Sequence, residues 1–184
     1  NKANSVTLVE INHKTIPFTK FNIVLNNVED KVRVKEGSLY ENLGNTTFDE
    51  IYVNPPFIAV PQDWNFPIAG NGGENGLEIT LNIIRGYKRH LNINGRAYMV
   101  GEAIGTEKEP FLIDELRTEL GNDFKITVIL DFKFSIEAHL RRSSAKNNFR
   151  LKFREKYNGD FVHTIKKVLR LKMIKQFIRL YIKK

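Results

Sequence analysis

The 184-residue sequence is 41% hydrophobic and 27% charged, proportions that are typical of a globular domain and exclude wholesale disorder. It contains no apolar run of about 20 residues, so no transmembrane segment is expected. There is no cysteine, which excludes disulfides and thiolate metal sites and favours a reducing, cytoplasmic location. Because the first residue is Asn1 and not Met, we expect a fragment or a processed product.

The net charge of +8 is concentrated at the C-terminal end. Residues 150–184 hold 12 of the 29 Lys and Arg residues but only Glu155 and Asp160 of the 21 acidic ones, a balance of +10. The remainder, with 17 basic and 19 acidic residues, carries −2. We therefore predict an α/β domain over residues 1–133 and a basic, mainly helical extension over residues 134–184.

Strand-like and helix-like patterns alternate along the first part of the chain. Short β-rich runs predict strands, and apolar residues at helical spacing predict helices. The strands are expected at 6–9, 32–36, 48–53, 97–100 and 125–132, and the helices at 13–27, 77–91 and 111–120. This β-α-β-β-α-β-α-β order predicts a mostly parallel sheet covered on both faces.

The C-terminal segment shows a different pattern. From Phe161, apolar residues recur at helical spacing with basic residues mostly on other faces, which predicts a basic amphipathic helix. Three roles stay open for the tail: contact with RNA phosphates, binding to an anionic membrane surface, or docking on this or a partner domain through the apolar stripe. The apolar positions are Ile165, Leu169, Met173, Phe177 and Leu180.

The segment Asn54-Pro55-Pro56-Phe57 follows the predicted strand 48–53. Neither proline has an N–H to donate, so the pair ends the strand and forms a rigid turn. The Asn54 oxygen and the backbone carbonyls could accept the two hydrogens of a planar NH2 group while Phe57 stacks on its π system. An ordinary exit from strand to loop is the alternative.

Other residues of the chain extend this pattern. Glu10-Ile11 ends the first predicted strand, where a carboxylate can accept hydrogen bonds from both ribose hydroxyls of a nucleotide-like ligand. Ser38-Leu39 follows the second strand. In this order and spacing, Glu10-Ile11, Ser38-Leu39 and Asn54–Phe57 resemble the second half of the cofactor site of class I S-adenosylmethionine-dependent methyltransferases, and the last segment resembles the branch that methylates planar nitrogens.

The segment Gly72-Gly73-Glu74-Asn75-Gly76-Leu77 is similar to an element of the release-factor glutamine methyltransferases. The resemblance spans about residues 6–130 and implies a Rossmann-like sheet that lacks its first strand and helix in this chain. It also implies S-adenosyl-L-methionine as the cofactor. The resemblance implies that the cofactor is bound by Glu10, Ile11, Ser38, Leu39 and Asn54. It implies that the catalytic residues are Asn54, Pro55, Pro56 and Phe57.

Two departures from the family pattern concern the cofactor. The glycine-rich turn that holds its methionine end would lie before Val6, where only five residues stand. Ser38 stands where the family usually has Asp at the adenine amino group, so we expect a weaker adenine contact. Trp64 and Phe66 are candidates either for the acceptor pocket or for a hydrophobic lid.

Other chemistries find little support. The glycines of 70–76 superficially match a dinucleotide fingerprint, but a proline-rich loop, not a strand, precedes them. No Walker-type loop or nucleophile elbow is present. The four histidines form no metal-binding pair, so we expect no metal: His13, His90, His139 and His163.

The sequence thus favours an N-methyltransferase acting on a planar amide or amino nitrogen, with protein glutamine as the preferred acceptor. A base in ribosomal or transfer RNA is the alternative acceptor, which the basic tail favours. A non-catalytic fragment or binding module that retains the fold is the alternative of another class.

Overall fold

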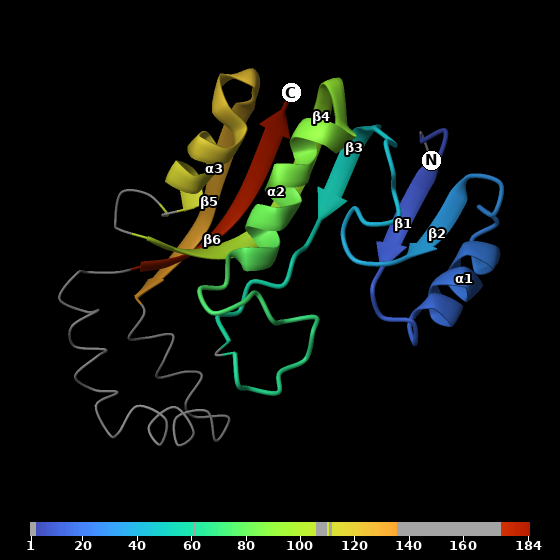
Figure 1. Cartoon of the computed structure of the whole chain (residues 1–184), viewed down its shortest axis with the longest axis horizontal. Helices are drawn as coiled ribbons and strands as arrows, with labels where there is room; N and C mark the ends of the chain where they lie inside the picture. The colour runs from blue at the N-terminus through green and yellow to red at the C-terminus, as the bar shows by residue number, and fades with distance from the viewer. Residues whose placement is uncertain (1–2, 61, 106–109, 111, 136–173) are drawn as a thin grey trace. The chain divides into compact units, whose positions relative to one another are not determined.

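The structure, a computed structural model, describes residues 3–60, 62–105, 110, 112–135 and 174–184 (Figure 1). The chain divides into two compact units, residues 1–47 (unit 1) and 48–184 (unit 2). The division falls between the predicted strands at 32–36 and 48–53. The domain boundary predicted at 133/134 is a different division, and it stays a prediction.

Unit 1 is a small β-α-β unit. Its strands β1 (Val6–Glu10) and β2 (Val32–Glu36) pair in parallel, with Val6 opposite Val32 and Glu10 opposite Glu36. Helix α1 (Ile16–Leu25) connects them and has proline in its first turn, where the missing N–H has no helical partner to lose. The parallel pairing brings the carboxyl ends of both strands to the same edge.

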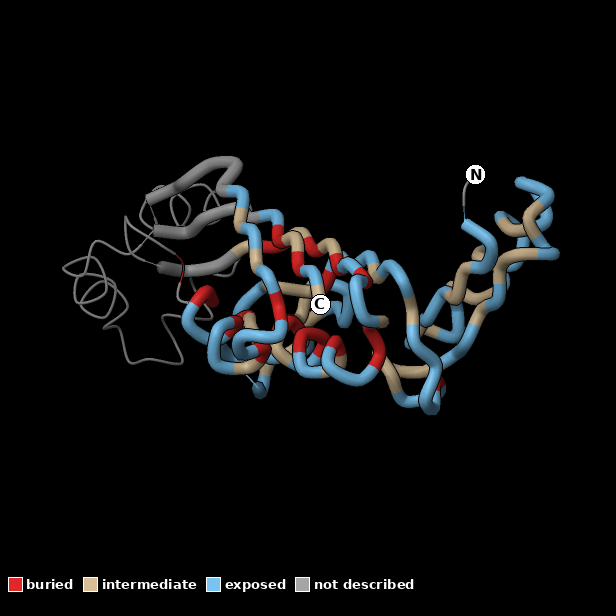
Figure 2. The backbone as a smooth tube through the Cα atoms, turned by 90° about the horizontal axis from the view of Figure 1, so that it is seen from above, coloured by how far each residue is buried: buried red, intermediate tan, exposed pale blue. Residues whose placement is uncertain are grey.

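The packing of unit 1 is sparse. No residue of α1 is buried, and Phe18 and Phe21 are 71% and 64% exposed. Leu43 is the one described hydrophobic residue of this unit that is buried. In Figure 2 the segments of unit 1 are almost entirely tan and pale blue. Two strands and one helix therefore leave much of their apolar surface in contact with solvent.

Unit 2 contains a four-stranded sheet in the order β3-β4-β6-β5. Strand β3 runs parallel to β4, whereas β6 is antiparallel to both β4 and β5. A short 3-10 turn (Gly121–Asp123) leads from α3 into β5. The elements are β3 (Phe48–Val53), α2 (Glu78–His90), β4 (Leu91–Gly105), α3 (Leu112–Leu120), β5 (Lys125–Ser135) and β6 (Ile174–Lys183).

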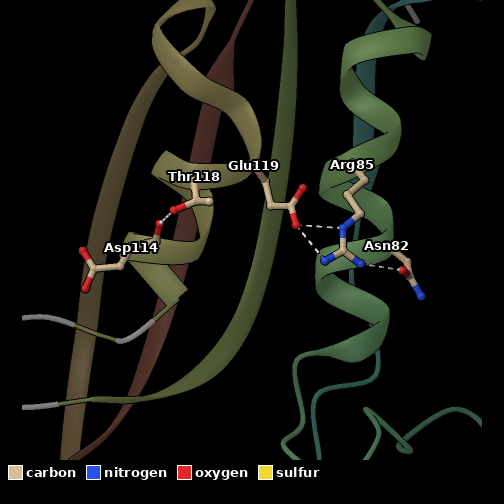
Figure 3. A network of polar contacts seen from close by, with 5 residues as sticks. All are labelled: Asn82, Arg85, Asp114, Thr118 and Glu119. Atoms are coloured by element: carbon tan, nitrogen blue, oxygen red, sulfur yellow. Dashed lines mark hydrogen bonds and ion pairs between the residues drawn. The ribbon is translucent and has the colours of Figure 1, made fainter.

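The core of unit 2 lies where α2 and α3 pack on the sheet, in front of it in Figure 1. Residues on alternate positions of β4 and β6 are buried because successive side chains of a strand point to opposite faces. The two helices also share an ion pair, in which Arg85 Nη2 lies 2.7 Å from Glu119 Oε1 (Figure 3). Fully or almost fully buried are Ile84, Tyr87, Leu112, Leu116, Leu120, Ala97, Leu180 and Ile182.

The opposite face of this sheet is not covered by a second layer of described helices. Tyr52 of β3 is 70% exposed and stacks on Tyr98 of β4, with ring centroids 4.9 Å apart. Tyr181 of β6 meets Tyr98 edge to face. Strands β3, β4 and β5 run in the same direction and β6 runs against them, so the predicted mostly parallel sheet is confirmed in strand direction, with one antiparallel strand that the sequence did not predict. Among the described residues of unit 2, helices cover one face of the sheet, and coverage of the other face stays a prediction.

The predicted C-terminal helix is also wrong for residues 174–183, which form β6. Leu180 and Ile182 are buried while Arg179 and Lys183 are exposed. This is the two-residue period of a strand, and pairing with two neighbouring strands outweighs the helical spacing seen in sequence. The remainder of that helix, residues 161–173, lies outside the described residues.

The predicted order of the other elements is confirmed. The strands at 32–36 and 48–53 have the bounds expected from sequence, and the remaining elements differ mainly at their ends. Strand β4 begins at Leu91, so the Asn94-Gly95 turn expected before the strand lies inside it. There Asn94 has a positive φ of 65°. In the part of the chain that the structure describes, no helix is both long and apolar enough to span a bilayer.

Candidate active site

Asn54-Pro55-Pro56-Phe57 lies directly after β3, as the sequence predicts. Pro55 is buried, whereas the side chain of Asn54 is exposed. Within the described residues the Asn54 amide makes no hydrogen bond, and the Pro55 carbonyl accepts none from the backbone. The turn therefore holds two oxygen acceptors that have no hydrogen-bond partner in the part of the chain that the structure describes.

The segment after this turn is held by the glycine-rich segment. Ile58 N donates to Gly70 O at 3.0 Å, and Gly72 N donates to Ile58 O at 2.9 Å. Val60 N donates to Gly73 O at 2.8 Å. These bonds form a short parallel bridge. The two motifs that were recognised separately in sequence are thus one structural element of unit 2.

The glycine-rich segment also leads into helix α2. Glu78 N donates to Gly72 O at 3.0 Å, and Leu77 N donates to the Asn75 side chain at 2.7 Å. Glu78 in turn accepts from Glu74 N at 3.1 Å. These bonds satisfy backbone groups just before α2. The glycine-rich segment is therefore a tight turn that is fixed to the first residue of α2.

Phe66 and Trp64 occupy the loop between the two motifs. A Cβ added to Gly70 would lie 2.8 Å from Phe66 Cε1 and 3.3 Å from Ile58 Cδ1, so the Phe66 ring covers Gly70 closely. Trp64 is half-buried. The packing of Phe66 on the bridge is consistent with the lid role, and an acceptor-pocket role for either residue stays a prediction.

The predicted ribose-binding residue, Glu10, ends β1 of unit 1. Its Oε1 accepts a hydrogen bond from Asn12 N at 2.7 Å, which holds the carboxylate at the turn after the strand. Glu10 Oε2 has no hydrogen-bond partner among the described residues. Ile11, which follows, is 49% exposed. One carboxylate oxygen is thus positioned and the other is available to a ligand.

Ser38 and Leu39 lie in the turn that follows β2, at the same edge as Glu10. Ser38 N donates to Glu41 Oε2 and Glu41 N donates to Ser38 O, both at 3.0 Å. Leu39 has φ 47°, a region that residues other than glycine seldom adopt. The neighbouring Tyr40 is half-buried, and burial raises its pKa, so its hydroxyl stays neutral at physiological pH.

These residues fit the ribose and adenine portions of S-adenosylmethionine in their chemistry. Glu10 offers a carboxylate oxygen for ribose hydroxyls, and Ser38 offers a hydroxyl that is unused within the described residues. Ile11 and Leu39 offer apolar contact for a ring.

A shallow groove of about 310 Å³ lies elsewhere in unit 1. Ile23 and Val24 of α1 and Val32 and Val34 of β2 form its apolar lining, and none of the predicted site residues lines it. Within unit 1, Glu10, Ile11, Ser38 and Leu39 lie at the same edge of the strand pair. Within unit 2, Asn54–Phe57 form the turn after β3. The contact between residues 58–60 and 70–73 is the part that the sequence did not predict.

The parallel pair of unit 1 and the mixed sheet of unit 2 are parts of an α/β Rossmann-like methyltransferase fold. The StiE O-MT structure resembles the chain with a TM-score of 0.52 at 10% identity, over 98% of this chain and 59% of that one. The family model described as "Methyltransferase small domain" matches residues 1–122. The chain belongs to this family, and the family implies S-adenosylmethionine as the cofactor.

Curated relatives include two enzymes named ribosomal protein uL3 glutamine methyltransferase. The one from Francisella tularensis is 27% identical over 99 residues, covering 50% of this chain and 32% of that protein. The one from Bradyrhizobium diazoefficiens is 28% identical over 124 residues, covering 63% and 37%. The alignments thus span less than two fifths of the length of either relative.

Proposed function

We propose that this chain acts as an S-adenosylmethionine-dependent N-methyltransferase. Its acceptor is a planar amide nitrogen, that of a glutamine side chain in a protein. The observation that carries the proposal is the turn at Asn54, where an exposed side-chain amide and the carbonyl of the buried Pro55 have no hydrogen-bond partner among the described residues. The relatives named glutamine methyltransferases support the same acceptor class.

The residues of unit 2 bind and orient the acceptor in this proposal. Asn54 Oδ1 and the Pro55 carbonyl accept the two N–H groups of the amide, which fixes the plane of the nitrogen and the direction of its lone pair. Phe57 stacks on the amide π system. Orientation of this kind supplies most of the rate acceleration, since no strong base is needed.

The residues of unit 1 bind the donor. Glu10 accepts from the ribose hydroxyls, Ser38 contacts the adenine amino group, and Ile11 and Leu39 pack on the ring. When bound, S-adenosylmethionine supplies an electrophilic methyl group. This methyl group would pass to the acceptor nitrogen that Asn54 and Pro55 orient, and that nitrogen would lose one proton to water.

Methylation of a base in ribosomal or transfer RNA is the second candidate. It is favoured by the +10 charge of residues 150–184, which would attract phosphates. The glutamine acceptor is preferred because Asn54–Phe57 and the segment Gly72–Leu77 occur together, as in the glutamine methyltransferases that the sequence resembles.

Two measurements test the proposal. Calorimetry with S-adenosylmethionine should give binding. Its absence, both in this chain and after any natural upstream sequence is restored, would remove both enzyme functions in favour of a non-catalytic binding module. Incubation with methyl-labelled cofactor should then transfer label to ribosomal protein and not to RNA. Label in RNA alone would overturn the glutamine acceptor.

A further inference from the structure

Phe57 is surrounded by three glycines from two different segments. A Cβ added to Gly72 would lie 2.8 Å from Phe57 Cα, and one added to Gly76 would lie 2.7 Å from Phe57 O. Distances below 3.0 Å between a Cβ and a backbone atom require the backbone to move. On the ring side, a Cβ on Gly101 of β4 would lie 4.0 Å from Phe57 Cδ1, an ordinary contact.

The conformation of Gly76 adds a second requirement. Its φ of 75° is in the region that side chains disfavour, whereas Gly72 lacks this feature and is limited by space alone. Both residues are buried. The hydrogen bond from Gly72 N to Ile58 O, at 2.9 Å, ties the same glycine to the residue after Phe57.

We infer that Gly72 and Gly76 are positioning residues that set the backbone of Phe57, and through it the stacking surface for the acceptor amide. The inference rests on the proposed function of Asn54–Phe57. Neither glycine has a side chain to contact a substrate. Because they lack a Cβ, the glycine-rich segment and the segment after Asn54 can approach each other closely. The atoms that a Cβ would meet are all main-chain atoms, which cannot rotate away as a side chain could, so this close approach fixes the position of Phe57.

This role explains why the two motifs occur together. A displacement of about 1 Å in a group that orients a reacting atom can lower the rate about 100-fold. A methyl group at position 72 would lie 2.8 Å from both Phe57 Cα and Gly76 O, and one at position 76 would lie 2.7 Å from Phe57 O, so main-chain atoms of the clamp would have to move. The glycine-rich segment therefore determines the geometry of the clamp without belonging to the surface that the acceptor contacts.

The test compares Gly72→Ala and Gly76→Ala with Gly121→Ala in the full chain. Gly121 also has a positive φ, 68°, but a Cβ there would have no atom within 4 Å. It therefore reproduces the backbone strain of Gly76→Ala without the contact on Phe57. Gly72→Ala adds the contact without the unusual φ, so it remains informative if Gly76→Ala fails to fold by circular dichroism.

The first readout is the rate of methyl transfer. We expect Gly72→Ala and Gly76→Ala to lose about 100-fold in kcat with an unchanged Kd for S-adenosylmethionine, while Gly121→Ala retains the kcat of the unmodified protein. A purely structural role would lower the melting temperature of all three variants without this selective loss in kcat. Equal kcat in all folded variants would overturn the inference.

The second readout does not depend on activity. The ring-proton NMR signals of Phe57, assigned by their disappearance in Phe57→Leu, should shift in Gly72→Ala and Gly76→Ala and not in Gly121→Ala. Unshifted signals would overturn the inference even for an inactive protein. Absence of transfer by the unmodified protein would overturn the proposed function instead, while the ring signals would still decide where Phe57 lies.

Discussion

The two units of this chain differ in how completely they bury their apolar residues. Of the described hydrophobic residues that are buried, Leu43 alone belongs to unit 1, and fourteen belong to unit 2. The colours of Figure 2 show the same contrast. The residues proposed to bind the acceptor, Asn54–Phe57, thus belong to a unit with its own core, whereas Glu10 and Ser38, proposed to bind the donor, belong to a unit without one.

The residues proposed for the methyl donor and those proposed for the acceptor are therefore supported by the fold to different extents. Below about 40 residues a chain seldom stabilises itself by hydrophobic burial alone, and unit 1 is close to that size. A parallel pair of strands is also seldom found without layers on both faces. We therefore expect the position of Glu10 and Ser38 to depend on additional packing or on a ligand, whereas the proposed clamp at Asn54–Phe57 is held by the sheet and helices of unit 2.

The largest expected effect is on the stability of unit 2. Leu116 of α3 is completely buried, so Leu116→Ala removes transfer free energy and leaves a cavity. We expect the free energy of unfolding to fall by about 2–5 kcal/mol. The matched change in unit 1 is Phe21→Ala, and since that ring is 64% exposed we expect a change within about 0.5 kcal/mol.

Urea unfolding followed by circular dichroism measures both variants. Similar losses for the two changes would mean that the ring of Phe21 is buried in solution and that the contrast between the units is wrong.

The next largest effect is on catalysis. Asn54→Ala removes the side-chain acceptor of the clamp, and we expect methyl transfer to fall about 100-fold with an unchanged Kd for the cofactor. Asn122→Ala is the control, because Asn122 is an exposed asparagine of the same unit that lies after α3. A rate of methyl transfer in Asn54→Ala equal to that of the unmodified protein would show that Asn54 takes no part in the mechanism.

A smaller effect is expected on donor binding. Glu10→Gln keeps the oxygen that Asn12 N contacts but removes the charge. Hydrogen bonds to a charged group contribute about 1.5–3 kcal/mol, so calorimetry should show binding of S-adenosylmethionine weakened about 10- to 100-fold. Glu29→Gln changes an exposed acid of the same unit and should leave binding as it is. Equal affinity in both variants would exclude Glu10 as a ribose ligand.

The smallest effect concerns the ion pair between α2 and α3. The hydrogen bond from Arg85 lowers the pKa of Glu119 in the folded state below its ordinary value. The pair therefore stabilises the fold above the unfolded-state pKa of Glu119, and this contribution disappears as the pH falls through the lower folded-state pKa.

Comparison with Glu119→Gln tests this prediction by urea unfolding. The unmodified protein should be slightly more stable at neutral pH and lose that advantage in acid. A difference that is constant with pH would contradict the assignment. Because exposed pairs contribute little, the effect should also shrink in high salt.

Much of the fold could be predicted because local patterns and tertiary structure agree. Alternation in Val32–Glu36 and the prolines after Val53 define strands with correct bounds. Residues 174–183 could not be assigned in this way, since their apolar spacing suits a helix as well as a strand. Only pairing with β4 and β5, which are distant in sequence, decides between the two.

The candidate site shows the same limit. Proline chemistry and strand ends predicted the positions of Asn54 and Glu10, because these signals are local. The bridge between Ile58 and Asn71 was not predicted, since it depends on close approach of two backbones. The one available signal was the density of glycines at 70–76, which indicated a turn but not its partner. Cytoplasmic location and the role of the basic tail stay predictions.

The most direct test of the acceptor clamp is to identify the methylated atom. Ribosomal protein incubated with S-adenosylmethionine and the unmodified chain should be digested and its modified peptide fragmented by mass spectrometry. We predict one methyl group on the side-chain nitrogen of a glutamine, absent when Asn54→Ala replaces the unmodified chain. A methyl group on an oxygen or carbon atom, or on glutamine nitrogen in equal yield with Asn54→Ala, would contradict this prediction.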